Sequence, residues 1–384
     1  MTESTYSLKE DVRIRLDHND QIRELAGDSK EITLHDIQEH AANPVWRMGE
    51  NYFVKVISQQ LADVERDWYT VFREEGFPSA ETIIVPYKGV QVLLVTSKVE
   101  GTSLADEIAQ KPNNEREPIF REMIDLSARL AMVATRAYKR NNQLRTTWGV
   151  FDKSEATFVY HRALSTYGKP ETIEKIAPNF AEALNRTNMY LAQQKEQRVI
   201  YLDAVGSNML RGPDGKLRRI DFEKVSAGRP FGFELTAILD TPVTTIRRMT
   251  EEQEQRLIQE GYMLLREQAK RTEGLQLAIP RDENALTAFY AASTVKNASA
   301  IKSRRDIIER DQRRLELPQY ERDEDETTLE KRIIENCAGR DFHYEKLKRS
   351  LTALHKQTKD DIFAKARDEL EDQLWRRMHK NCNY

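Results

Sequence analysis

The sequence predicts an α+β protein with two lobes, in which a small antiparallel sheet carrying one helix precedes a mainly helical lobe with a helical C-terminal extension. Three observations support this class. Short β-rich runs are concentrated in about the first 100 residues, helical periodicity takes over after Gly101, and charged residues are dense in the last third. A chain of 384 residues also exceeds one compact core and suits two or three domains. We therefore expect boundaries at 1–97, 98–316 and 317–384.

Composition argues against several classes of protein. Hydrophobic residues make up 39% and charged residues 32%, so the chain can bury a core beneath an unusually charged surface. A formal net charge of −3 gives no argument for a nucleic-acid or membrane partner. Cys337 and Cys382 have no second cysteine at metal-ligand spacing, which disfavours a zinc site or a disulfide framework. The polar N-terminus is unlike a signal peptide and no apolar run is long enough to span a bilayer, so we expect a cytoplasmic protein.

The first lobe is predicted from four β-rich runs and one helical stretch. The runs cover 45–48, 52–57, 82–85 and 91–96, and the helix covers about 60–75. Gly49, Glu50 and Asn51 separate the first two runs and predict a tight hairpin turn. Gly76 and Pro78 predict the end of the helix. The order strand, strand, helix, strand, strand is that of a small sheet with one helix packed on it.

The second lobe is predicted to be helical around a β-ribbon. Apolar residues recur at helical spacing from Ile119, with Pro118 in the first turn, and a second helix covers about 170–194. The segment 141–170 between them is expected to be an aromatic-rich loop. Strands at 198–202, 208–211 and 216–220 form the ribbon, whose last two strands are joined by Pro213-Asp214-Gly215. Beyond Thr250 the chain reads as helical, with a solvated linker over 317–328.

One segment combines the residue types that phosphoryl transfer requires. Asp203 is followed five residues later by Asn208, and Asp221 comes after the predicted hairpin. The reaction needs a carboxylate that orients the attacking hydroxyl and oxygen ligands that hold magnesium on the phosphates. Asp203 suits the first task, and Asn208 and Asp221 suit the second. An Asp or Asn considered alone is more often a turn or capping residue, so the prediction depends on finding all three residues together.

This segment resembles the catalytic and metal-binding loops of the protein-kinase-like superfamily, in particular its aminoglycoside phosphotransferase and choline kinase branch. The pattern of that branch is His-Gly-Asp, four residues, Asn, and later Ile-Asp-Phe-Glu. Here Tyr201 and Leu202 stand at the His and Gly positions, and Glu234 stands where a structural Asp follows the metal-binding loop. The resemblance covers roughly residues 30–240. It implies a two-lobed kinase-like fold whose first lobe binds the nucleotide, with ATP and Mg²⁺ as cofactors.

The resemblance also implies roles for residues of the first lobe. Lys55 would contact the α- and β-phosphates of ATP, and a lysine in an apolar run requires an anionic partner, for which Glu65 on the inward face of the helix is the candidate. An edge-strand lysine without this role is the alternative. Backbone groups of Ser97, Lys98 and Val99 would bind the adenine. The segment 38–43, which includes His40 and contains no glycine, occupies the place of the phosphate-covering loop.

The resemblance thus implies an ATP- and Mg²⁺-dependent phosphotransferase that acts on a hydroxyl group of a small molecule. Asp203 would deprotonate the acceptor, with the aromatic segment 148–161 nearby. Two alternatives stay open. One is transfer to a protein or an RNA, supported only by the basic cluster over 302–314. The other is a kinase-fold binding module without catalysis, favoured by the departures at Tyr201 and Leu202.

The C-terminal third is interpreted as a solvated helical extension. Two apolar stripes at helical spacing leave self-association open as a second interpretation. The stripes consist of Leu347, Leu351 and Leu354, then Leu370, Leu374 and Met378. No membrane partner is expected, and the basic cluster lacks the interleaved aromatic residues that would favour nucleic acid.

Overall fold

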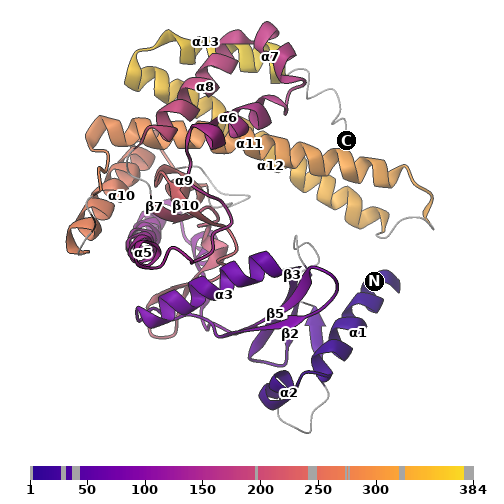
Figure 1. The fold of residues 1–384 in the computed structure, drawn as a ribbon. Helices are drawn as coiled ribbons and strands as arrows, with labels where there is room; N and C mark the ends of the chain where they lie inside the picture. The colour runs from indigo at the N-terminus through magenta and orange to yellow at the C-terminus, as the bar shows by residue number, and fades with distance from the viewer. Residues whose placement is uncertain are drawn as a thin grey trace.

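The computed structural model describes residues 3–26, 32–36, 44–194, 198–240, 249–272, 275, 277–319 and 325–375. A sheet-containing lobe at the N-terminal end lies below a larger helical lobe in Figure 1. The segment 38–43 with His40, predicted to cover the phosphates, lies outside the described residues. Among the described helices, none is both long enough and apolar enough to cross a membrane.

The first lobe is built on a five-stranded antiparallel sheet in the order β1-β2-β3-β5-β4. The strands are β1 (Leu34–Asp36), β2 (Val45–Met48), β3 (Tyr52–Ser58), β4 (Thr82–Pro86) and β5 (Gln91–Ser97). β2 and β3 pair through the turn that the sequence predicts, where Gly49 has a φ of 58°, a left-handed conformation that favours glycine. β3 and β5 form the centre of the sheet, so Lys55 comes from a central strand rather than an edge.

Helices cover both faces of this sheet. Helix α3 (Gln59–Glu74) is capped by the Ser58 hydroxyl and contributes Ala62 to a cluster with Ile57 and Leu94 on one face. Helices α1 (Glu3–Asp17) and α2 (Asp20–Ala26), which the sequence interpretation missed, cover the opposite face. Because side chains alternate along a strand, Lys55 lies on the same face as Ile57, toward α3.

The second lobe contains most of the helices. They are α4 (Leu104–Gln110), α5 (Asn113–Arg140), α6 (Lys153–Leu164), α7 (Pro170–Ile176), α8 (Pro178–Ala192), α9 (Gly232–Leu239), α10 (Glu251–Arg271), α11 (Asp282–Leu315), α12 (Glu326–Thr358) and α13 (Asp361–Glu369), followed by a π-helical turn, Leu370–Trp375. The ribbon strands are β6 (Thr102–Ser103), β7 (Arg198–Tyr201), β8 (Met209–Arg211), β9 (Leu217–Arg219) and β10 (Val225–Arg229).

The helices from α5 to α8 differ from the sequence-based expectation. The aromatic segment expected to be a loop contains α6, whose N-terminus is capped by the Asp152 carboxylate. The helix expected over 170–194 is two helices, because Pro178 starts α8 directly after α7. Pro118 lies inside α5 rather than in its first turn, because that helix starts at Asn113.

An aromatic cluster connects the two lobes. Trp68 and Phe72 of α3 pack against Tyr201 and Phe222 of the second lobe, with the Phe72 and Phe222 rings 5.0 Å apart and the Tyr201 and Phe222 rings 5.2 Å apart. All four side chains are almost fully buried in one core that also runs through the helical lobe. The position of α3 is therefore coupled by packing to the segments that carry Asp203 and Asp221.

The C-terminal helices are part of the second lobe rather than a solvated extension. Leu347, Leu351, Leu354, Leu370 and Leu374 are buried in the main core. Helix α12 runs beside α11, and α13 packs on α8 (Figure 1). The leucine stripes that left self-association open therefore contact the chain's own core, apart from Met378, which lies outside the described residues.

Candidate active site

The two loops that carry the predicted catalytic residue and the predicted metal ligands meet at the same end of a two-stranded sheet. β7 and β10 pair antiparallel, with Tyr201 opposite Val225. The chain leaves β7 just before Asp203 and enters β10 just after Glu223, so these segments lie side by side. The backbone N–H of Leu202 donates to the Lys224 carbonyl at 3.0 Å, which extends the pairing into the loops. Residues about 20 positions apart in the sequence therefore meet at one edge.

Asn208 is held between the same two loops. It ends the 3₁₀ turn η1 (Gly206–Asn208), and its carbonyl accepts a hydrogen bond from the Ile220 N–H at 3.0 Å. Its side-chain Nδ2 donates to the Asp203 carbonyl at 3.1 Å. The β8–β9 hairpin thus brings Asn208 beside the residue that precedes Asp221, as the spacing in the sequence predicts.

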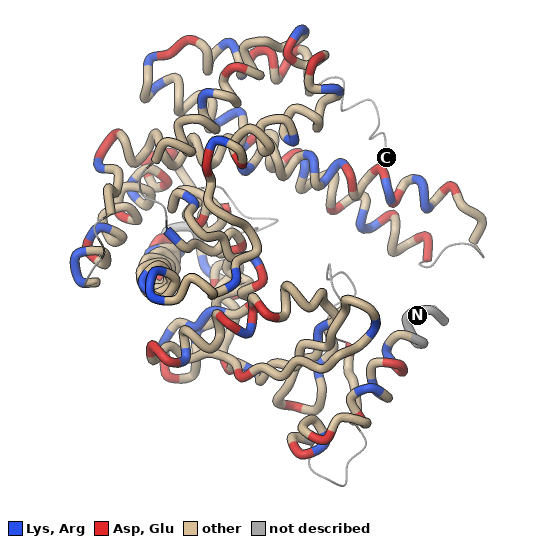
Figure 2. The backbone as a smooth tube through the Cα atoms, viewed as in Figure 1, with Lys and Arg blue, Asp and Glu red and all other residues tan. Residues whose placement is uncertain are grey.

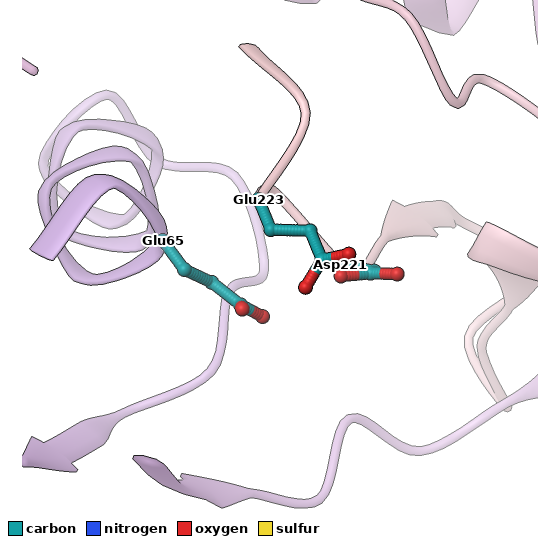
Figure 3. Close-up of side chains that lie close together, drawn as sticks. All are labelled: Glu65, Asp221 and Glu223. Atoms are coloured by element: carbon teal, nitrogen blue, oxygen red, sulfur yellow. The ribbon is translucent and has the colours of Figure 1, made fainter. Parts of the chain in front are cut away.

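The Lys55 side chain, from β3 of the first lobe, forms ion pairs with carboxylates of both lobes. Its Nζ lies 3.6 Å from Glu65 Oε2, 3.0 Å from Asp221 Oδ1 and 2.6 Å from Glu223 Oε2. The side chain is 16% exposed, so these ion pairs are shielded from solvent. Figure 3 shows the three carboxylates pointing toward one another, one from α3 and two from the segment before β10.

Burial and charge oppose each other in this group. Burial disfavours the Lys55 ammonium, but the carboxylates of Glu65, Asp221 and Glu223 outweigh it and raise the pKa of Lys55 above its ordinary value. Burial raises the pKa of Glu65 to about 7. The Lys55 ammonium opposes this rise, whereas repulsion from the carboxylates of Asp221 and Glu223 adds to it. Lys55 is therefore a fixed cation, whereas the Glu65 carboxyl group is partly protonated near neutral pH.

Asp221 is held in an unusual backbone conformation. Its φ of 63° is left-handed, and its N–H donates to the Tyr69 hydroxyl at 3.1 Å. The next residue, Phe222, points into the core, so Asp221 and Glu223 both lie on the opposite side of the chain. Glu223 was not singled out from the sequence, but its spacing of two from Asp221, across a buried Phe222, is the signal that could have found it.

Asp203 is paired with a lysine that the sequence interpretation also missed. Lys224 Nζ lies 2.7 Å from Asp203 Oδ2, and the two side chains are 43% and 31% exposed. Both are therefore accessible to a small molecule. No local sequence signal indicates this contact, because it depends on how β7 and β10 pair.

The departures from the family pattern at Tyr201 and Glu234 support each other. The Tyr201 N–H donates to Glu234 Oε2 at 3.4 Å, and Glu234 Oε1 accepts from Arg219 at 2.9 Å. The Arg219 guanidinium also lies over the Tyr201 ring, 4.3 Å from its centroid. The loop before Asp203 is thus fixed by an aromatic ring and a buried ion pair.

The predicted adenine-binding segment follows β5. The N–H groups of Ser97 and Lys98 donate to the carbonyls of Glu81, at 2.8 Å, and of Asn51, at 2.7 Å. Val99 has no backbone hydrogen bond within the part of the chain that the structure describes. Of the three residues expected to bind adenine, Val99 is therefore the one whose N–H is available.

The aromatic residues of the segment 148–161, which was expected near the acceptor, lie in different parts of the second lobe. Trp148 pairs with Ser226 of β10 and so runs beside the site. Phe151 packs on Phe233, the Tyr160 hydroxyl donates to Glu174, and Phe158 is 60% exposed on α6. Trp148 is therefore the member of this segment that the fold brings to the strand entering the site.

The donor set suits a hard divalent cation. Glu65, Asp221 and Glu223 offer carboxylate oxygens that all lie within 4.8 Å of one another. Magnesium prefers such oxygen ligands. Glu65 Oε2 and Glu223 Oε2 are buried and ion-paired with Lys55, and neither accepts a well-aligned hydrogen bond, so both keep acceptor capacity for a cation. The residues present therefore fit a Mg²⁺ ion, with Asn208 held next to them.

A cavity of about 1020 Å³ lies elsewhere in the helical lobe. It is lined by the ends of α8 and α10 and the segment before α11, including Tyr190, Arg266, Lys270, Ile279 and Arg281. None of the residues discussed above lines it, so it forms no part of the candidate active site.

Comparison with known proteins identifies the family. Residues 33–262, more than half of the chain, match the sequence model of the phosphotransferase enzyme family. Among curated proteins, none matches the sequence significantly. Among solved structures, a protein assigned as an aminoglycoside phosphotransferase from Ralstonia eutropha JMP134 is 11% identical, with a TM-score of 0.54 over 90% of this chain and 98% of that one. A choline/ethanolamine kinase family protein from Mesorhizobium loti is 10% identical, with a TM-score of 0.51 over 94% and 99%.

These two likenesses show the fold, and they extend over the C-terminal helices as well as the matched family region. The kinase-like architecture that the sequence predicts, with a small antiparallel sheet and a mainly helical second lobe, is confirmed. The suspected branch of the superfamily is confirmed as well. The chain belongs to the phosphotransferase enzyme family.

Proposed function

We propose that the protein transfers the terminal phosphoryl group of ATP, with Mg²⁺, to a hydroxyl group of a small molecule. The observation that carries the proposal is the meeting of Lys55 with Asp221 and Glu223 at the edge where Asp203 and Asn208 also lie. This set offers a cation for phosphates, oxygen ligands for a metal and a carboxylate for the acceptor.

Each residue of the set has a proposed role. Lys55, held by Glu65, would bind the phosphates, and Asp221, Glu223 and Asn208 would supply oxygen ligands to Mg²⁺. The bound Mg²⁺ would neutralise charge that develops on the phosphates. Val99, and with it the neighbouring Ser97 and Lys98, would lie along the adenine.

Asp203 is proposed to accept the proton of the acceptor hydroxyl. As that proton leaves, the acceptor oxygen forms a bond to the terminal phosphorus. The bond between this phosphorus and the bridging oxygen breaks, and its electron pair stays on the departing ADP. Asn208 would hold the Asp203 backbone in place through its hydrogen bond to the carbonyl.

The contacts of the basic cluster disfavour a macromolecular acceptor. Lys302 pairs with Asp306 at 2.8 Å, and Arg305 pairs with Glu309 at 2.5 Å. Arg304 donates to Asn336 at 2.8 Å. Figure 2 shows basic and acidic residues interspersed along α11 and α12 rather than a single basic face. The observation that alone supported an RNA or protein acceptor is thereby weakened.

Nucleotide binding is the first test. ATP with Mg²⁺ should raise the melting temperature of the wild type, corresponding to about 2.7 kcal/mol at a hundredfold excess over the Kd. Asp221→Asn removes the charge of one proposed magnesium ligand. This variant should lose the part of the melting-temperature rise that depends on Mg²⁺. Asp125→Asn, on the surface of α5 and paired with Arg129, is the matched control and should behave like the wild type.

Catalysis is tested separately from binding. Asp203→Asn should keep the magnesium-dependent shift but lose phosphoryl transfer by about a hundredfold or more. Absence of a shift with any nucleoside triphosphate would overturn the proposal and favour the non-catalytic binding module.

A further inference from the structure

Lys224 is a cation in direct contact with the proposed base. Its Nζ lies 2.7 Å from Asp203 Oδ2, and its backbone carbonyl accepts a hydrogen bond from the Leu202 N–H at 3.0 Å. The backbone contact holds the segment of Lys224 beside the loop of Asp203, so the ion pair joins two segments that the fold already keeps together. Among the described residues, Lys224 is the cation that forms an ion pair with Asp203.

Lys55 and Lys224 divide the carboxylates of the site between them. Lys55 Nζ lies 3.0 Å from Asp221 Oδ1 and 2.6 Å from Glu223 Oε2, two of the proposed magnesium ligands. Lys224 directly follows Glu223 in the chain, but its ammonium contacts Asp203 instead. One lysine therefore lies on the side of the metal ligands, and the other lies on the side where the acceptor would bind.

The surroundings of Lys224 are negatively charged. An accessible lysine is an ammonium cation at neutral pH. Partial burial disfavours this cation, but the carboxylates of Asp203, Glu223 and Asp221 outweigh the burial and raise the pKa of Lys224 above its ordinary value. A bound nucleotide would add further negative charge, which the two lysines and the proposed Mg²⁺ would have to neutralise together.

The proposed reaction brings the transferred phosphoryl group within reach of Lys224. An acceptor hydroxyl that gives its proton to Asp203 has to lie about 3 Å from that carboxylate. The terminal phosphorus has to lie about 3.5 Å from the same hydroxyl oxygen before transfer. The phosphorus therefore comes within about 6 Å of Asp203 Oδ2, which is itself 2.7 Å from Lys224 Nζ.

Lys224 has donors that remain available for a ligand. An ammonium group has three N–H donors, and within the described part of the chain Asp203 accepts from one of them. The Lys224 and Asp203 side chains are 43% and 31% exposed, so a small anion can reach both. An ion pair with this exposure is weak. A phosphoryl group can therefore draw the ammonium away from Asp203.

We propose that Lys224 is a catalytic cation that donates hydrogen bonds to the transferred phosphoryl group from the acceptor side. This inference rests on the proposed phosphotransferase function and adds a residue to it. The bond between the terminal phosphorus and the bridging oxygen breaks, and its electron pair goes to ADP. The acceptor oxygen bonds to the phosphorus, and its proton goes to Asp203.

Lys224 keeps its own protons throughout this step. Its ammonium stabilises the negative charge on the phosphoryl oxygens at the moment of transfer. By moving from Asp203 to the phosphoryl group, it also frees the Asp203 carboxylate to accept the proton of the hydroxyl. The contact with Asp203 is therefore the resting position of this cation.

Aluminium fluoride with ADP tests the contact without a known acceptor. Its anion resembles the phosphoryl group during transfer and occupies the same place next to ADP and Mg²⁺. ADP is titrated calorimetrically with Mg²⁺, in the presence and in the absence of aluminium fluoride. In the wild type, aluminium fluoride should strengthen ADP binding by about a hundredfold or more, as an analogue of a transition state does.

Substitutions of lysine provide the variant and its control. Lys224→Gln should reduce this gain by about tenfold or more, while ADP binding without aluminium fluoride stays as in the wild type. Lys224→Arg should retain most of the gain, because it keeps the charge. Lys216→Gln removes the same charge from an exposed lysine just before β9, and it should leave both affinities unchanged. Melting temperatures without ligand show whether each variant is folded.

Asp203→Asn distinguishes a contact with the phosphoryl group from a role in positioning the base. If Lys224 only held Asp203 in place, the aluminium fluoride complex would depend on Asp203, and Asp203→Asn would lose as much of the gain as Lys224→Gln. The proposed contact predicts instead that Asp203→Asn keeps the gain, because no carboxylate then competes for Lys224.

The outcomes separate this inference from the proposed function. The role of Lys224 is excluded if aluminium fluoride gives the wild type no gain, if Lys224→Gln gains as much as the wild type, or if Asp203→Asn loses as much as Lys224→Gln. Magnesium-dependent ADP binding that is lost in Asp221→Asn would in that case still support the phosphotransferase. If the wild type does not bind ADP with Mg²⁺, both proposals fail.

Discussion

Arg219 and Glu234 lie behind the loop that carries Asp203, with side chains 1% and 0% exposed. Removing one partner of such a pair leaves an uncompensated buried charge. Arg219→Met should therefore lower the free energy of unfolding by about 3–5 kcal/mol. Combining it with Glu234→Leu should recover part of this loss, because no buried charge remains.

Urea unfolding of the two variants and the wild type measures these differences. Both variants lack the Arg219 side chain. The difference in unfolding free energy between them therefore measures the effect of removing the unpaired Glu234 carboxylate. A double variant no more stable than Arg219→Met would contradict the argument and give the main role to the Glu234 hydrogen bond with Tyr201.

His343 gives the stability of the protein a predictable dependence on pH. Its Nδ1 lies 2.7 Å from Asn297 Oδ1, and burial lowers its pKa from 6.5 to about 4, assisted by the nearby Lys296, Arg304 and Lys346 and opposed by Asp240. Between these two pH values the unfolded chain binds a proton that the folded protein does not. The corresponding stability is fully present above pH 6.5 and is lost as the pH falls through this window.

We expect a fall from pH 6.5 to about 4.5 to cost the wild type about 2 kcal/mol more than it costs His343→Gln. Urea unfolding of both proteins at the two pH values measures this difference, and other titrating groups cancel in the comparison. Equal losses would mean that His343 is protonated in the folded protein.

Single residues also show how far the sequence could predict the site. The sequence was sufficient to find Asp203, Asn208 and Asp221, because these residues lie close together along the chain in a characteristic pattern. Lys224 was not found. Its partner is set by the pairing of β7 with β10, which no local pattern encodes.

Elements with strong periodicity and clear ends were the best predicted. The helix expected at about 60–75 is α3, Gln59–Glu74, because Ser58 and Gly76 bound a sustained apolar face. Helix α6 was missed because Phe158 is exposed and obscures the periodicity of a short helix. The capping pattern of Asp152 with Glu155 three residues later was the available signal.

The end of α12 offers an opportunity to stabilise the protein. Lys359 follows the helix with a φ of 57°, a left-handed conformation that costs a residue with a β-carbon roughly 1 kcal/mol. Lys359→Gly should raise the free energy of unfolding by about 0.5–1 kcal/mol. Lys359→Ala is the matched control, since it removes the charge but keeps the β-carbon.

Urea unfolding of the two variants checks this prediction. Equal gains in both would assign the effect to removal of the lysine side chain rather than to the backbone. No gain in the glycine variant would mean that the greater freedom of the unfolded chain offsets the relief of strain.

At the scale of the whole molecule, the C-terminal helices are predicted to be indispensable for folding. Removal of residues 326–384 would expose the apolar surface that Leu347, Leu351 and Leu354 cover. We expect such a chain to be insoluble or to lose its cooperative thermal transition.

Far-ultraviolet circular dichroism during heating, together with the yield of soluble protein, measures the outcome. A soluble shortened chain with an unchanged transition would mean that the C-terminal helices are an extension that the rest of the fold does not need.

The two-lobed plan could be predicted because its elements occur in a recognisable order. The leucine stripes predicted amphipathic helices, but spacing alone cannot say which surface an amphipathic face covers.

The left-handed backbone at Asp221 narrows the set of amino acids that the position admits. Such a conformation is common only for glycine, asparagine and aspartate, whose small or locally bonding side chains tolerate it. Of these three, aspartate alone brings a negative charge. Glutamate has the same charge but one more carbon and no such tolerance. Among related sequences, position 221 should therefore exclude glutamate for a reason of shape, while the neighbouring position 223, which lacks this constraint, can accept either acid.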